Sequence, residues 1–238
     1  MKRFYLSVLF LCSFGSLFAG GPSFAFCDYS QGKVFIQENG EIVWEHKAPD
    51  SNDIWVLPNK NILFTAGKEV LEVSRKNDTI FHYTSESNIF ACQRLKNGNT
   101  FIGECDNGRL LEVSPDGSIV KDVSILPFGV KTGGHAFMRN ARCLDNGHYL
   151  VAHYGGKSVV EYDENGKAVW NIPISGGAHS VIRLPSGNTL VAVTDKDNNP
   201  GVFEYDMAGN IVWSLTNKDL PGTLKFAGGM HYLSDGRL

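Results

Sequence analysis

Short runs of apolar and β-branched residues recur along the chain, separated by polar turns that are rich in glycine. Within runs such as 189–193 and 209–213 the pattern suits short pleated strands, and no sustained helical period is present. The composition agrees, because 26 Gly and 9 Pro are many for a helical protein, while 15 Phe and 8 Tyr suit half-buried sheet surfaces. We therefore predict an all-β fold.

The first recurring element is an apolar residue followed by a tight polar turn. Most copies contain Asn-Gly, Asp-Gly or Ser-Gly, and such residues tolerate the positive φ that a two-residue hairpin turn of the primed type requires. We therefore predict a tight β-hairpin at each copy. The copies begin at Leu57, Leu95, Leu144, Leu184 and Leu233, which lie 38, 49, 40 and 49 residues apart.

The second recurring element is a pair of strands joined by another such turn. Its copies occupy residues 35–44, 71–81, 111–121, 160–170 and 203–213. Three copies end in tryptophan (Trp44, Trp170 and Trp213), which we expect to pack between neighbouring repeats. Together the two elements give four strands in about 43 residues, the size of one propeller blade. The predicted fold is a β-propeller of four-stranded antiparallel blades.

Five repeat units are visible, and four of them are complete. Residues 33–46 supply only a third and a fourth strand, and residues 230–238 supply only a first strand and the start of a second. These fragments would form one split blade. Because the chain stops at Leu238 within a strand, we expect a truncated piece of a longer propeller, with a five-bladed ring as the alternative. The complete units span residues 54–83, 89–124, 138–172 and 180–215.

The N-terminus has the pattern of a secretory signal peptide. Basic residues at positions 2 and 3 precede an apolar run over residues 4–18, and small residues follow. Cleavage after Ala19 or after Ala25 fits this pattern. We therefore expect a periplasmic or extracellular protein with no membrane span after cleavage. The predicted organisation is a signal peptide over residues 1–25 and a single propeller domain, complete or truncated, over residues 26–238.

Charge and cysteine content narrow the classes of function. The 22 basic and 25 acidic side chains give a net charge of −3, and loss of Lys2 and Arg3 makes it −5. No basic cluster is present, so we expect no nucleic-acid partner. Four cysteines follow the signal peptide and allow three pairings, which we leave open beside the alternative of buried thiols. They are Cys27, Cys92, Cys105 and Cys143.

The segments from Glu161 to Trp170 and from Glu204 to Trp213 resemble the repeat of propellers of the pyrroloquinoline-quinone (PQQ) type, with its D-x-x-G-x-x-x-W element. This resemblance implies the propeller fold over nearly the whole mature chain. The same repeat occurs in quinone-dependent dehydrogenases and in exported proteins that are not enzymes. Quinone dehydrogenases carry an adjacent Cys-Cys pair beside the cofactor, and this sequence has none. We therefore expect no cofactor, PQQ included.

A second resemblance concerns the segment from His179 to Leu190, which is similar to the histidine-containing blade openings of bacterial arylsulfotransferase propellers. It implies an enzyme that acts on an anionic substrate such as a sulfate ester. That family has an extra N-terminal domain, for which this sequence has no counterpart.

Candidate functional residues gather where the irregular loops meet. If the first strand of each blade runs from an upper to a lower face, the tight turns lie below, and loops of variable length lie above. Paired glycines precede three histidines near inner strands, and a guanidinium takes the repeat position of one of them. Such groups bind anions, ligate metals or move protons, although propeller histidines also serve merely to join blades. The predicted ligand-binding residues are His135, Arg139, Tyr154, His179 and His231, and the catalytic candidates are His135, Arg139, His153 and His179.

Two function classes remain open at this point. The first is an exported binding or scaffold protein that holds a small molecule, a glycan or a protein on the upper face near the central channel. The alternative is an enzyme, sulfotransferase-like or lyase-like, that acts on an anionic substrate. The residue types at Asp195, Asp197 and Asn199 weakly resemble a calcium loop, but Pro200 stands where such a loop needs glycine. We therefore expect no metal.

Overall fold

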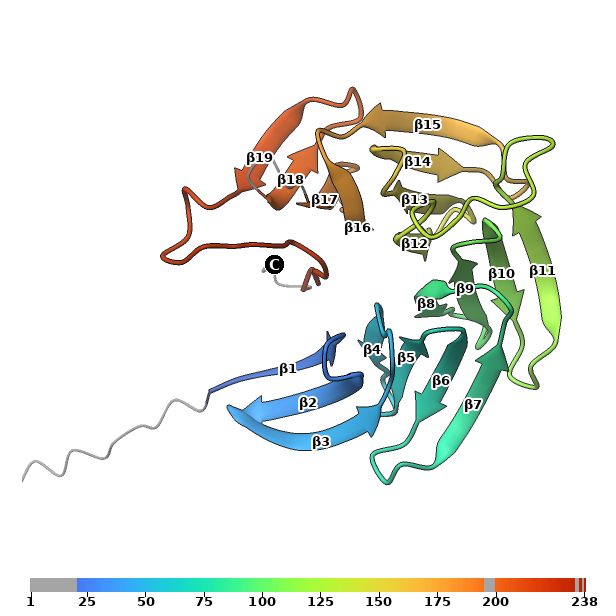
Figure 1. The fold of residues 1–238 in the computed structure, drawn as a ribbon, viewed down its shortest axis with the longest axis vertical. Coiled ribbons are helices and arrows are strands. Elements are labelled where there is room, and N and C mark those ends of the chain that lie inside the picture. Colours follow the sequence, from blue (N-terminus) through green and yellow to red (C-terminus); the bar gives the residue numbers. More distant parts are fainter. Residues whose placement is uncertain (1–20, 195–199, 234–235, 237) are drawn as a thin grey trace, which may run out of the picture.

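The computed structural model describes residues 21–194, 200–233, 236 and 238. Its strands form five antiparallel sheets, which follow one another around a common centre in the order of the sequence (Figure 1). The protein is a five-bladed β-propeller, which confirms the predicted all-β propeller fold and matches the five visible repeat units. No helix long and apolar enough to cross a bilayer occurs in the described part of the chain.

The sheets correspond to the predicted repeats, and the strand bounds lie within three residues of the predicted ones for the four complete units. The first blade consists of β1 (Gly21–Asp28), β2 (Lys33–Asn39) and β3 (Glu41–Lys47). The second consists of β4 (Ile54–Val56), β5 (Ile62–Ala66), β6 (Glu69–Val73) and β7 (Thr79–Thr84). The third consists of β8 (Ile89–Arg94), β9 (Thr100–Glu104), β10 (Arg109–Val113) and β11 (Ile119–Ser124). The fourth consists of β12 (Asn140–Cys143), β13 (Tyr149–His153), β14 (Ser158–Tyr162) and β15 (Ala168–Pro173), and the fifth of β16 (Gly177–Arg183), β17 (Thr189–Thr194), β18 (Gly201–Tyr205) and β19 (Ile211–Leu215).

The first blade differs from the prediction because it has a strand that the sequence pattern did not reveal. Strand β1 pairs with β2 in antiparallel register from Phe24, opposite Gln37, to Asp28, opposite Lys33. The rings of Phe24 and Phe26 lie 5.4 Å apart, and Phe26 stacks on Phe35. The prediction assigned most of this segment to the signal peptide, since its apolar residues directly follow the leader.

We propose that signal cleavage occurs after Ala19. Cleavage after Ala25 would cut through β1 and remove the residues that pair with Gln37 and Ile36. Cleavage after Ala19 leaves the whole strand in the mature chain. Intact-mass measurement of the protein recovered after export is expected to show Gly20 as the first residue. A mature chain that starts at Phe26 would contradict this prediction.

The C-terminal segment does not form the strand predicted over residues 230–238. The described residues of this segment, namely 230–233, 236 and 238, have no strand structure. Met230 and Tyr232 nevertheless pack against the apolar cluster of Leu184, Leu190 and Val202 in the fifth blade. Figure 1 shows the segment between the fifth blade and the first. It therefore supplies apolar contacts where a further inner strand was expected.

The tight turns of the lower face are mostly three-residue loops, and the prediction of two-residue primed turns was wrong for them. In the β8–β9 turn the amide of Gly98 donates to the carbonyl of Leu95 at 3.0 Å, and Gly98 has a φ of 91°. This is a type I turn followed by a left-handed residue. Only the Asn39-Gly40 turn, with φ values of 53° and 88°, has positive φ at both central residues.

Third-strand glutamates fasten the turns between the first and second strands of four blades. Each carboxylate accepts a hydrogen bond from the side chain that closes the turn below it, and these bonds are 2.6 to 2.8 Å long. Because these turns are short and internally bonded, the lower face offers little freedom to bind a ligand. The pairs are Glu72 with Asn61, Glu112 with Asn99, Glu161 with His148, and Glu204 with Asn188.

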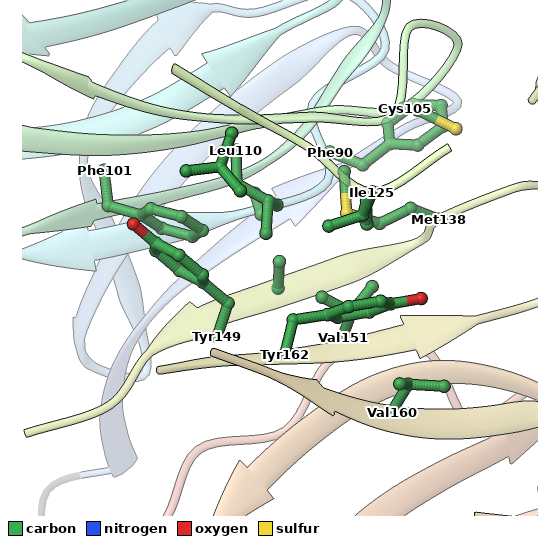
Figure 2. Packing of buried hydrophobic residues seen from close by; sticks show 13 residues of the cluster. Phe90, Phe101, Cys105, Leu110, Ile125, Met138, Tyr149, Val151, Val160 and Tyr162 are labelled. Atoms are coloured by element: carbon green, nitrogen blue, oxygen red, sulfur yellow. The ribbon is translucent and has the colours of Figure 1, made fainter. Parts of the chain in front are cut away.

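The hydrophobic core lies between blades rather than within them. Figure 2 shows the cluster between the third and fourth blades, in which the rings of Phe101 and Tyr149 stack at 5.6 Å. The repeated tryptophans contribute where a next blade is present: Trp44 is buried, and the indole N–H of Trp170 donates to Met207 O at 2.8 Å. Trp213 on β19 is 43% exposed, because no following sheet covers it.

All four described cysteines are free. Cys92 and Cys105 are buried, and burial raises the pKa of Cys105 to about 11. Burial also raises the pKa of Cys27 to about 12. The thiols therefore stay protonated at neutral pH and pack as small apolar groups.

Candidate functional site

A cavity of about 1990 Å³ occupies the centre of the propeller. The inner strands β4, β8, β12 and β16 of four blades all line its wall, for example with Trp55, Gln93, Arg142 and Ile182. The upper mouth of the cavity is lined by side chains from the loops and strand ends above them. These are Tyr29, His135, Arg139, Tyr154, His179 and Phe226.

The repeat brings Arg139 and His179 to the same level of the cavity. Each lies five residues before the leucine that begins the lower turn of its blade, Leu144 and Leu184 respectively. The backbone amide of Arg139 donates to Ala152 O at 3.0 Å, which places the residue directly before β12. The equivalent residue of the third blade is Phe90, whose ring lies against the guanidinium of Arg139. Neighbouring blades therefore assemble the upper mouth from one repeat position.

Arg139 has aromatic neighbours and, among the described residues, no carboxylate partner. Its Cζ lies 4.7 Å from the ring centroid of Phe90 and 5.4 Å from that of Tyr154. The Nε atom is buried and has no hydrogen-bond partner in the described structure. A guanidinium is always charged at physiological pH, and a buried donor without an acceptor is costly. The geometry therefore leaves a positive charge and unused donors at the mouth of the cavity.

The other charged side chains that line the cavity are paired. Arg142 binds Asp53, Arg183 binds Glu161, and Asp145 binds Lys96, at distances of 2.6 to 2.8 Å. Among the described cavity residues, Arg139 alone carries a charge without an opposite charge within ion-pair distance. The cavity therefore has one uncompensated positive side chain, and it lies at the upper mouth.

His179 is a neutral neighbour of this charge. Burial, followed by the charge of Arg139, lowers the pKa of His179 to about 4. Its Nδ1 lies 3.3 Å from the carbonyl of Gly228, which only accepts, so Nδ1 carries the proton and Nε2 keeps a lone pair. The ring of Phe226 meets the imidazole edge to face at 4.9 Å. At neutral pH His179 therefore adds polarity to the site but no charge.

The glycine at position 177 lets Tyr154 reach the site. A Cβ atom on Gly177 would overlap the ring of Tyr154. The Tyr154 ring in turn stands edge to face with the imidazole of His179, at 6.3 Å. The paired glycines before this inner strand therefore permit a close approach of an aromatic side chain, which places Tyr154 between Arg139 and His179.

His153 lies apart from the other candidates. Its side chain is 5% exposed, and it does not line the cavity. Its Nδ1 bonds to Phe137 O at 2.8 Å, and its Nε2 bonds to the hydroxyl of Tyr162 at 2.9 Å. Burial lowers the pKa of this imidazole. Both nitrogens thus serve to hold the loop before β12 against the fourth blade.

The two remaining histidine candidates line the cavity at separate places. His135 is exposed and meets the Phe90 ring edge to face at 5.3 Å. His231 meets the indole of Trp55 at 6.1 Å. The structure therefore brings together Arg139, Tyr154 and His179, with His135 beside the shared ring of Phe90.

The weak metal candidates Asp195, Asp197 and Asn199 lie outside the described residues. Within the residues that are described, no group of three or more His, Cys, Asp or Glu side chains is arranged to hold a metal ion.

Sequence reasoning missed the ion pair that crosses the cavity below Arg139. Arg142 of the fourth blade donates to both carboxylate oxygens of Asp53 in the second blade, at 2.6 and 3.0 Å. Asp53 also accepts the amide of Cys92 at 2.9 Å, and the Arg142 guanidinium lies 5.1 Å from the indole ring of Trp55. These residues lie 89 positions apart in the sequence, so only the closed arrangement of blades reveals the pair.

No protein-family model and no curated protein matches the sequence, whereas many solved structures share its fold. A protein of unknown function from Bacteroides caccae has a TM-score of 0.77 at 22% identity, covering 88% of this chain and 78% of that one. Catalytically inactive virginiamycin B lyase from Staphylococcus aureus, in a structure with quinupristin, has a TM-score of 0.56 at 13% identity, covering 84% and 74%. BBS1N in complex with ARL6DN has a TM-score of 0.56 at 17% identity, and the match covers 86% of this chain and 64% of that one.

The likeness is one of fold. At these identities the comparisons support a β-propeller and do not transfer an activity. The similarity to arylsulfotransferase propellers gains no support from them. The chemistry of this protein has to be argued from its own cavity.

Proposed function

We propose that this protein is a ligand-binding propeller whose central cavity takes a small molecule that carries an anionic group. The observation that supports this most is Arg139, a cavity-lining guanidinium without a counter-ion among the described residues. An anion from solution would satisfy its donors and balance its charge. The aromatic rings of Tyr154 and Phe226 stand beside it to contact the rest of the molecule.

Binding is better supported than catalysis by the same residues. Proton transfer at neutral pH favours a base whose pKa lies near 7, and His179 has a pKa of about 4. His153, a second candidate for such a role, is buried with both nitrogens engaged. One fold neighbour, virginiamycin B lyase, is known in a structure with the small molecule quinupristin. We take that as support for a propeller that binds a small molecule and carry over neither a site nor a reaction.

We also propose that binding takes place outside the cytoplasm. The support is the basic start and apolar run within residues 1–25, which is typical of exported proteins. The reduced cysteines are compatible with this location because burial keeps the thiols of Cys92 and Cys105 protonated and poorly reactive.

The proposed function is tested by titration calorimetry with four small aromatic probes. Phenylacetate, phenyl sulfate and phenyl phosphate carry an anionic group, and benzyl alcohol is their neutral counterpart. We expect at least one of the anions to bind more tightly than benzyl alcohol. Replacing Arg139 by glutamine is expected to weaken that binding by about 30-fold or more, because a charged hydrogen-bond partner is lost.

The matched control removes an exposed charge from the same loop. Lys131 is exposed and does not line the cavity, so Lys131→Gln is expected to leave the affinity unchanged. Equal binding of the anions and benzyl alcohol would refute the proposed function. So would equal losses in the Arg139 and Lys131 variants, since the effect would then come from net charge alone.

A further inference from the structure

The cavity has features that select among anions by charge. It offers one uncompensated positive side chain, Arg139, while Arg142 and Arg183 are already held by Asp53 and Glu161. His179 adds no charge at neutral pH. A ligand with a single negative charge would balance the site, whereas a dianion would leave one charge unpaired beside low-polarity walls. Such a charge would lie near the rings of Phe90 and Tyr154, whose π faces are negative, and not near a second cation.

The shape of the donor group favours a flat acceptor. The N–H donors of a guanidinium lie in one plane, and two of them match the two oxygens of a carboxylate in parallel hydrogen bonds. Phe90 and Tyr154 both contact the Arg139 guanidinium, which restricts its orientation. A carboxylate that approaches within the guanidinium plane keeps both ring contacts. A tetrahedral anion presents its further oxygens out of that plane, toward the rings of Phe90 and Tyr154, which offer them no hydrogen-bond donor.

The walls around Arg139 favour an apolar body on the ligand. Tyr154 and Phe226 line the mouth, and Phe226 is 54% exposed. Tyr29 and Phe24, which also line the cavity, are 58% and 47% exposed. Exposed aromatic rings around a cavity favour flat or apolar ligand surfaces, because contact removes both from water.

We propose that the cavity is selective for monocarboxylates that carry an aromatic or other flat apolar group, with the carboxylate on Arg139 and the apolar group against Tyr154 and Phe226. This inference rests on the proposed function and adds the class of ligand. It differs from the general proposal by excluding phosphate esters and polar sugar acids as preferred ligands.

The test compares ligands that differ in one property at a time, with the wild-type chain and calorimetry at pH 7. Phenylacetate and phenyl phosphate share the phenyl ring but differ in charge. Phenyl sulfate is a tetrahedral monoanion, and glucuronate is a monocarboxylate without an apolar ring. We expect phenylacetate to bind at least about tenfold more tightly than phenyl phosphate and glucuronate. The affinity for phenyl sulfate is expected to lie between that for phenylacetate and those for the other two.

Two variants check the geometry of binding. Arg139→Lys keeps the charge but cannot make two parallel hydrogen bonds, so it is expected to lose about tenfold in affinity for phenylacetate and to lose less for phenyl phosphate. Phe226→Ala is expected to weaken the binding of phenylacetate and to leave the affinity for glucuronate unchanged. Phe226 is half exposed, so the variant is expected to fold.

The outcomes separate this inference from the proposed function. If phenyl phosphate, phenyl sulfate or glucuronate binds as tightly as phenylacetate or more tightly, the monocarboxylate inference is overturned, while an Arg139-dependent anion site stands. If no anion binds better than benzyl alcohol, both proposals fall. Both proposals are supported if phenylacetate has the highest affinity of the probes and if the Arg139→Gln variant loses this preference.

Discussion

Replacement of Arg142 by alanine is expected to lower the free energy of unfolding by about 3–5 kcal/mol, because it leaves the carboxylate of Asp53 buried without its partner. The two side chains are only 13% and 7% exposed. Asp53 also accepts a hydrogen bond from the amide of Cys92 in the third blade. The substitution is therefore expected to weaken the contacts among the second, third and fourth blades. Urea denaturation followed by circular dichroism measures this change.

The exposed pair between Arg75 and Glu38 provides the control. Their side chains are 34% and 50% exposed, so Arg75→Ala is expected to cost no more than about 1 kcal/mol. The double variant that lacks both Asp53 and Arg142 is expected to be more stable than the sum of the two single losses indicates. A loss for Arg142→Ala no greater than that for Arg75→Ala would show that the pair does not hold the blades together.

Replacement of Phe101 by alanine is expected to cost about 3–5 kcal/mol, because a large ring is removed from the packed interface of the third and fourth blades. Phe101 is 1% exposed and stacks on Tyr149, as Figure 2 shows. The stacked partner belongs to the next blade, so the surrounding strands cannot close the cavity without moving a whole sheet. Thermal and urea unfolding of the variant measure the effect.

Val120 on β11, the outermost strand of the same blade, is the matched apolar control. It is 56% exposed, and Val120→Ala is expected to change stability by no more than about 0.5 kcal/mol. If Phe101→Ala costs less than about 1 kcal/mol, the interface relaxes freely around the missing ring. The claim that the core lies between blades would then be wrong for this pair.

Repetition explains why most of the fold was predictable from the sequence. The turns after Leu57, Leu95, Leu144 and Leu184 recur at intervals that match one blade, and the strands between them follow from local alternation. Strand β1 was missed because it has no complete repeat of its own and lies directly after the predicted signal peptide. The hairpin geometry also differed, because one positive φ at Gly98 suffices for a three-residue loop.

The candidate site was predictable in position more than in detail. The shared repeat position predicts that Arg139 and His179 are neighbours, and in the structure both residues line the central cavity. Their chemistry depends on partners distant in sequence, such as Phe226 beside His179 and Tyr162 beside His153. Nothing in the local pattern around His153 distinguishes a buried structural imidazole from one that faces solvent. The charge balance that singles out Arg139 requires the Asp53–Arg142 pair, which crosses the propeller.

The uncovered outer strand of the last blade has a consequence for the width of the molecule. No described strand of the fifth sheet is paired with the first sheet, and β19 has no buried residue. The described contacts of the C-terminal segment beside this strand are made by side chains, with Met230 and Tyr232 on the fifth blade and His231 on Trp55 of the second. Widening of this junction would therefore separate fewer packed side chains than the parting of the third and fourth blades, whose facing surfaces form a buried cluster.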